Sequence, residues 1–200
     1  MDTANQMYKI LQYFVCQGYY RDALSVLQDS NDLNNYNVNY LLVLSIAYNQ
    51  LHMVELLVSY GAETNYKDSY CLKLACILGR TRAVELLLQT DVDINASNGY
   101  PLSVACANGH MPIVKVLLRH GVDINANNDH ALRWAHSNKQ TQVVHFLVSQ
   151  GADPSAIINR SESPYILSCQ LLQHGFFITR TSTINGIPNT SCIEITAENF

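Results

Sequence analysis

The sequence lacks an excess of basic residues, a long apolar run and a signal peptide, and each absence removes a class of function. It has 12 lysines and arginines against 16 acidic residues, a formal net charge of -4, whereas nucleic-acid-binding proteins usually present a basic face. No stretch approaches the ~20 apolar residues of a transmembrane helix, and the first 20 residues lack a basic start followed by an apolar core. We therefore expect a cytoplasmic protein that binds neither nucleic acid nor membrane.

Catalytic and metal-binding motifs are missing as well. The six cysteines show no C-x-x-C spacing, so we expect reduced thiols rather than disulfides, a zinc site or a redox centre. No H-E-x-x-H, G-x-x-x-x-G-K or G-x-S-x-G motif occurs, and the nearest approach to an acid–base or metal pair is His52 with Glu55, which we interpret as a solvated helix face. We therefore expect no enzyme activity, no catalytic residue, no metal and no cofactor.

A 30-residue period runs through the centre of the chain. Glycine, leucine, valine and asparagine each recur at this spacing in the same register, which indicates a repeat array rather than chance. The columns are Gly61, Gly121 and Gly151; Leu42, Leu72, Leu102 and Leu132; Val54, Val84, Val114 and Val144; and Asn65, Asn95 and Asn125.

Each period predicts two helices joined by a tight turn. In one period, residues 102–108 form a short helical stretch, Gly109 breaks it, and residues 111–120 show the apolar spacing of a second helix. The glycine that follows the second helix suits the left-handed C′ position, where a side chain costs energy. Cys76 and Cys106 occupy one column beside a column of small residues, so we expect them in the core rather than as ligands or nucleophiles.

These units resemble the ankyrin repeat. The stretches that carry the resemblance are Asn98-Gly99-Tyr100-Pro101-Leu102-Ser103-Val104-Ala105, Asn108-Gly109-His110, Leu117-Leu118 and Gly121-Val122-Asp123-Ile124-Asn125. The last unit, with its Phe146-Leu147-Val148-Ser149-Gln150-Gly151-Ala152-Asp153 end, resembles in particular the ankyrin proteins that giant DNA viruses of amoebae encode in large sets. The resemblance implies an all-α solenoid of stacked helix-turn-helix units, each of which needs its neighbours to bury its apolar face.

The resemblance divides the chain into a central array with degenerate ends. We expect the N-terminal cap to present a polar outer face, and a helix at residues 165–175 to close the other end. The expected parts are a capping repeat at 1–34, four repeats at 35–154, a C-terminal cap at 155–175 and a tail of unknown structure at 176–200.

The chain departs from the family in two places. The common ankyrin unit has 33 residues and this one has 30, and the missing residues fall in the loop between Asn125 and Leu132 and its equivalents. We therefore expect short hairpin loops and a recognition surface displaced toward the first helices.

Asp91 fills the C′ glycine column, so we expect it in costly left-handed geometry, and Asp91→Gly would then be stabilising.

An aromatic column, Tyr40, Tyr70, Tyr100 and His130, stands where the family usually has the threonine of Thr-Pro-Leu-His. Two interpretations are open: the rings form a ladder for ligand stacking, or each packs on the ring of the next unit and stabilises the array. We favour the second.

Two neighbouring columns at the end of the first helix vary from unit to unit, and variation indicates exposure. In the family this region faces the concave groove, so we predict partner binding there, by an apolar patch with polar neighbours. The alternative is that a cap or the N-terminal helix covers it. The candidate residues are Tyr48, Ile77, Leu78, Asn108 and Asn138, together with Lys67, Ser97, Asn127 and Asp129 in the shortened loops.

Two functions follow from the resemblance. The first is a monomeric, non-catalytic protein–protein interaction module whose concave surface binds a host or viral protein. The second is an adaptor that also recruits machinery such as a ubiquitin ligase through residues 155–200, although these residues contain no F-box-like pattern. The partner itself is not encoded in the fold.

Overall fold

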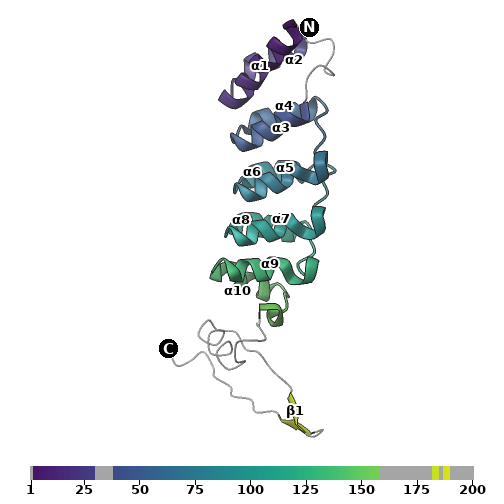
Figure 1. Cartoon of the computed structure of the whole chain (residues 1–200), viewed down its shortest axis with the longest axis vertical. Coiled ribbons are helices and arrows are strands. Elements are labelled where there is room, and N and C mark those ends of the chain that lie inside the picture. The colour runs from purple at the N-terminus through teal and green to yellow at the C-terminus, as the bar shows by residue number, and fades with distance from the viewer. Residues whose placement is uncertain (1, 30–37, 158–181, 185–186, 190–200) are drawn as a thin grey trace. The chain divides into compact units, whose positions relative to one another are not determined.

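Ten α-helices form five antiparallel pairs in the computed structural model, which describes residues 2–29, 38–157, 182–184 and 187–189. In Figure 1 the pairs lie in successive layers. The first helices, here called inner, are α1 (Asp2–Gln17), α3 (Val38–Ala47), α5 (Tyr66–Ile77), α7 (Ala96–Ala107) and α9 (Ala126–Ser137). The second helices, here called outer, are α2 (Tyr20–Asp29), α4 (Leu51–Ser59), α6 (Thr81–Leu87), α8 (Met111–Arg119) and α10 (Thr141–Ser149).

Contacts between layers join like helices. Each inner helix packs on the inner helix of the next layer, from α1 through α3, α5 and α7 to α9, and outer helices pack in the same order from α2 to α8. The fold of residues 2–157 is therefore an all-α solenoid of stacked helix pairs, as the 30-residue period predicts.

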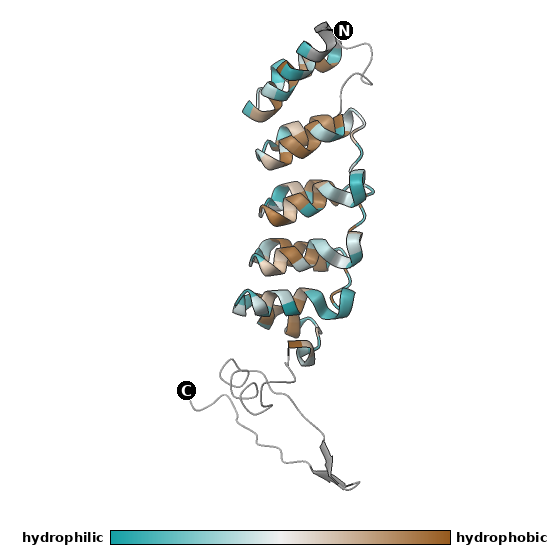
Figure 2. Ribbon diagram, in the orientation of Figure 1, coloured by the Kyte–Doolittle hydropathy of each residue, from teal (hydrophilic) through white to brown (hydrophobic). Residues whose placement is uncertain are grey.

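Repeat columns supply the core. Leu42, Leu72, Leu102 and Leu132 are fully buried, and burial of each leucine side chain contributes about 1.5–3 kcal/mol before entropic costs. Cys76 and Cys106 are also fully buried, and burial raises the pKa of both thiols, so they are inert core residues. Figure 2 shows the same core as apolar segments along each helix pair.

The N-terminal layer is less polar than the sequence suggests. Leu11, Val15, Ala23 and Leu27 are buried in this layer. Its helix α1 nevertheless exposes Met7, Ile10 and Tyr13, so the expectation of a polar outer face is wrong.

No further helix pair follows α10 in the part of the chain that the structure describes. A short 3-10 helix, η2 (Pro154–Ile157), packs against α9, and Ile157 is buried there. The helix expected at residues 165–175 lies outside the described residues. In the second unit, the described strands β1 (Ser182–Ile184) and β2 (Ile187–Asn189) pair in antiparallel orientation. No described helix is both long enough and apolar enough to cross a membrane.

Candidate partner-binding surface

The turns from inner to outer helices form one edge of the layers, here called the turn edge. At this edge Tyr48 is 56% exposed, Ile77 40% and Leu78 39%, and Asn108 and Asn138 are exposed in the later layers. Tyr48 also shares a side-chain hydrogen bond with Cys16 of the N-terminal helix α1, so that helix reaches this edge while leaving part of Tyr48 exposed. The role of these side chains in binding remains a prediction.

Side chains that reach back to the preceding layer brace the turn edge. Gln140 donates from Nε2 to the carbonyl oxygen of Ala107 (3.3 Å), and His110 Nε2 lies 3.2 Å from that of Ile77. Each carbonyl belongs to the last turn of an inner helix, where no intrahelical donor remains. Side chains at this repeat position, such as His110 and Gln140, therefore cap the C-terminus of the inner helix in the preceding layer.

Glycine makes room for these braces. Gly109 has a φ of +72°, and a Cβ there would collide with the Gln140 amide; Gly79 has a φ of +69°, and a Cβ would lie 2.8 Å from the His110 ring. Asn49 occupies the same column with a φ of 59° and does carry a Cβ. The brace above it is Arg80, whose longer side chain reaches the carbonyl oxygen of Ala47 at 3.4 Å.

The opposite edge, here called the loop edge, is built from left-handed turns. Lys67, Asp68 and Ser69 have φ of 49°, 58° and 54°, so they interrupt the right-handed helical backbone near the start of α5. Equivalent triplets begin at Ser97 in α7 and Asn127 in α9. These turns form part of the short loops and place Lys67, Ser97, Asn127 and Asp129 near the starts of α5, α7 and α9. Tyr48, Ile77 and Leu78 lie instead at or just after the ends of α3 and α5.

Asparagine side chains hold the loop edge together. The Oδ1 atom of Asn65 accepts the backbone N–H of Asp93 at 2.7 Å, and Asn95 accepts that of Asp123 at 3.2 Å. Each bond joins one layer to the next. The asparagine column found in the sequence is therefore a ladder of hydrogen bonds that fixes the spacing of the layers.

A second polar link joins α5 to α7. Lys73 Nζ lies 2.9 Å from Asp68 Oδ2 and donates to Ser97 Oγ at 3.1 Å, and Ser97 also donates to Asp68. Hydrogen bonds from Ser97 and Lys73 hold the pKa of Asp68 below its ordinary value. Ser97, a candidate binding residue, is thus engaged inside the array.

Asp129 is the least satisfied of the candidates. Its Oδ1 atom is buried and has no hydrogen-bond partner among the described residues. Desolvation raises its pKa, and the carboxylates of Asp153 and Asp123 add to this effect, while Arg133 opposes it. The residue carries a local electrostatic cost rather than an obvious contact for a partner.

The aromatic column is only partly packed. Tyr100 meets Trp134 of the next inner helix edge to face at 5.9 Å, not His130 of its own column, and His130 packs on the same tryptophan at 4.2 Å. Tyr40 and Tyr70 are each 43% exposed. The expected ring-on-ring stacking therefore does not run along the column. Tyr40 and Tyr70, which the sequence interpretation treated as structural, belong to the exposed apolar surface.

Asp91 does not adopt the geometry expected of its column. Gly61, Gly121 and Gly151 have φ of 86°, 80° and 101°, whereas the φ of Asp91 is not positive. The helix before it, α6, ends at Leu87, and the chain tightens through N–H bonds from Gln89 to Leu86 and from Thr90 to Leu87. The expectation of a strained Asp91 is wrong because this helix ends earlier than the others.

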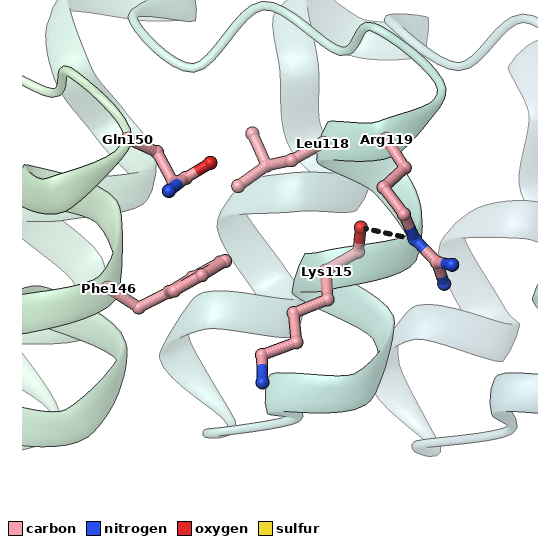
Figure 3. Close-up of a pocket in the computed structure, with 5 residues that line it drawn as sticks. All are labelled: Lys115, Leu118, Arg119, Phe146 and Gln150. Carbon is pink, nitrogen blue, oxygen red and sulfur yellow. Dashed lines mark hydrogen bonds between the residues drawn. The ribbon is translucent and has the colours of Figure 1, made fainter.

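A shallow groove lies on the outer helices, between α8 and α10. Its volume is about 520 Å³, and Lys115, Leu118, Arg119, Phe146 and Gln150 line it (Figure 3). The ammonium group of Lys115 lies 5.5 Å from the centre of the Phe146 ring. This distance is within the range of a cation–π interaction.

The described residues contain no cluster of three or more histidine, cysteine or acidic side chains that could hold a metal ion. Residues 72–157, from α5 to η2, match the family model for ankyrin repeats, which spans three copies. No curated protein matches the chain. Residues 72–157 of the solenoid are thus similar to ankyrin repeats, a module that generally mediates protein–protein interaction.

Proposed function

We propose that this protein is a non-catalytic binding module that holds another protein on the surface of its inner helices, with Tyr48, Ile77 and Leu78 as the main anchors. The single observation that supports it is that these three large apolar side chains are all exposed at the turn edge. A contiguous exposed apolar patch beside polar neighbours is typical of a protein interface. Asn108 and Asn138 supply such neighbours along the same edge.

The test is a double substitution, Tyr48→Ala with Leu78→Asp. Because both side chains are exposed, we expect helical content and the unfolding midpoint to stay near wild type while capture of the most enriched partner from a cell lysate is abolished. The matched control is Glu55→Ala with Arg119→Asp, which places the same two residue types at exposed positions of outer helices.

A core variant, Leu117→Asp, calibrates the test, since Leu117 is fully buried and the variant should unfold the array. If the double variant itself unfolds the protein, the patch is core and the proposal is wrong. If it folds and still captures the partner as well as the outer-helix control does, binding takes place elsewhere. The adaptor alternative rests on residues 155–200, and no described residue favours it.

A further inference from the structure

The N-terminal layer leaves an apolar face of the stack open. In Figure 1 helices α1 and α2 form the first layer, and no described layer precedes them. Helix α1 exposes three large apolar side chains, with Met7 38%, Ile10 37% and Tyr13 54% exposed. At the opposite end, η2 packs against α9 and Ile157 is buried there. Of the two ends of the described layers, only the N-terminal one exposes large apolar side chains in this way.

Side-chain braces show which residues of α1 correspond to those of the later inner helices. Gln50 donates from Nε2 to the carbonyl oxygen of Cys16 at 3.4 Å. The same kind of brace joins Arg80 to the carbonyl oxygen of Ala47 one layer later. Cys16 is therefore the equivalent of Ala47, and α1 is offset from α3 by 31 residues.

Two columns of the inner helices lose their cover in α1. With this offset, Ile10 and Phe14 are the first members of columns whose later members are all buried, yet both are themselves partly exposed. Leu11 and Val15 of the same helix are fully buried, so loose packing of α1 does not explain the difference. The columns of Ile10 and Phe14 are therefore those that a preceding layer covers elsewhere in the stack. Their later members are Leu41, Cys71, Pro101 and Ala131, and Ser45, Ala75, Ala105 and Ala135.

Helix α2 shows the same loss of cover. Leu24 stands 30 residues before Val54 and so belongs to the valine column. Leu24 is partly exposed, whereas every later member of the column is buried. Both helices of the N-terminal layer therefore present apolar side chains toward the position that a preceding layer would take.

The residue types on this face suit a second copy of the chain better than one more layer of the same kind. Phe14 places a ring where the later layers carry serine or alanine, and small residues are what allow two layers to approach closely. The face also carries little charge: Lys9 is the only charged residue between residues 6 and 17, and Arg21 and Asp22 of α2 have opposite signs. Two such faces can therefore meet without strong repulsion, although the whole chain has a net charge of -4.

The same face is complementary to itself. Head-to-tail stacking would need a free C-terminal layer, but η2 already packs against α9 there. In an antiparallel pairing of two α1 helices centred on Ile10, Met7 of each copy lies opposite Tyr13 of the other, because both stand three residues from Ile10. A thioether sulfur against an aromatic ring is a favourable contact. A patch that meets its own copy in this way closes as a twofold dimer.

We propose that two copies of this chain associate face to face through their N-terminal layers, with Ile10, Phe14 and Leu24 of each copy at the centre of a four-helix contact. The contact continues the packing of inner on inner and outer on outer helices that joins the layers within one chain. The proposal goes beyond the binding function and replaces the monomer expected from the sequence. A dimer carries two turn-edge patches, so it holds a partner with two matching segments more tightly than a single copy does.

The test measures the mass of the full chain in solution by sedimentation equilibrium between roughly 1 and 200 μM, a range suited to the weak affinity of a small interface. Wild type is expected to shift from 22.4 kDa toward twice this mass, with no larger species, because a twofold contact closes. A chain that stays monomeric throughout this range refutes the proposal, and so does a series of larger species that grows with concentration.

Variants locate the contact, and each is first checked for an unchanged unfolding midpoint. Met7→Lys with Tyr13→Lys brings charges into the contact and should raise the dissociation constant at least about tenfold. The matched control, Tyr70→Lys with Ile77→Lys, adds the same charges to side chains of α5 that are 43% and 40% exposed, and should leave the dissociation constant unchanged. Ile10→Ala adds no charge, shortens the side chain at the centre of the contact and should also weaken association.

The outcomes separate this inference from the proposed function. If the α1 variants remain as dimeric as wild type, or if the α5 control dissociates the dimer to the same extent, the contact lies elsewhere and the inference is wrong. If the charged α1 variant loses its fold, Ile10→Ala decides the outcome. Capture of a partner through Tyr48 and Leu78 is measured separately, so a monomeric chain that still captures its partner overturns the dimer and leaves the proposed function standing.

Discussion

Gly109→Ala should cost about twice as much stability as Gly121→Ala, although both glycines have similar backbone angles, with φ of +72° and +80°. A left-handed alanine costs about 1 kcal/mol. At Gly121 this is the whole effect, because no atom lies within 4 Å of an added Cβ. At Gly109 the methyl group also displaces the Gln140 amide, whose hydrogen bond to the Ala107 carbonyl is worth about 1 kcal/mol.

We therefore expect losses of ~2 kcal/mol for Gly109→Ala and ~1 kcal/mol for Gly121→Ala. Urea unfolding followed by far-ultraviolet circular dichroism measures both, provided the dependence on denaturant is unchanged. Gln140→Ala alone should cost ~1 kcal/mol, and adding Gly109→Ala to it should cost only the backbone strain, a coupling of about 1 kcal/mol. Equal costs for the two glycines, or no coupling, would refute the idea that the amide brace requires glycine beneath it.

Two further predictions concern acidic residues. Asp91→Gly should destabilise the array by about 0.5–1 kcal/mol, because Asp91 is not left-handed and glycine only adds freedom to the unfolded chain; a rise in the denaturation midpoint would contradict this. Asp129→Asn should stabilise the array at neutral pH by about 0.5 kcal/mol, since it removes a partly desolvated charge that also lies near Asp153 and Asp123. Because the pKa of Asp129 is raised in the folded protein, the wild type regains this stability as the Asp129 carboxyl protonates. The stability advantage of the variant should therefore vanish as pH falls below 3.8, the ordinary pKa of the aspartate carboxyl. An advantage that persists in acid would exclude charge as the cause.

The helix pairs and the core could be predicted because each depends on a signal that repeats within the sequence. Leu102 and Leu132 mark the same buried position in successive layers, and Gly109 marks the break between two helices. Averaging over units removes the ambiguity that a single short helix would leave. The same averaging gave a wrong prediction of left-handed geometry at Asp91, because it assumes that every outer helix ends at the same repeat position. Helix α6 ends earlier, at Leu87.

The left-handed turns could not be predicted from local preference. Positive φ costs energy at Lys67, Asp68 and Ser69. Hydrogen bonds from the next layer offset this cost: the backbone N–H of Asp93 donates to Asn65, and Ser97 donates to Asp68. The 30-residue period shows how many residues each unit lacks relative to the family. The backbone conformation of the shortened loop, however, depends on contacts between layers.

The candidate site was predicted unevenly. Exposure of Tyr48, Ile77 and Leu78 followed from their variation among units, because packing constrains buried columns more tightly than exposed ones. The exposure of Tyr40 and Tyr70 was missed, since a repeated aromatic was taken as a packed one. A signal was present: the column ends in His130 while Trp134, one turn later on α9, supplies the ring that Tyr100 contacts.

The two ladders of hydrogen bonds, asparagines at the loop edge and the braces at the turn edge, limit how such a chain can change in evolution. Both join atoms about one unit apart, from Asn95 to Asp123 and from Gln140 to Ala107. One residue inserted into a connecting loop would offset a donor from its acceptor at a boundary between layers. Duplication or loss of a whole 30-residue unit leaves every donor opposite its acceptor, so a change in length by whole layers disturbs these two ladders least.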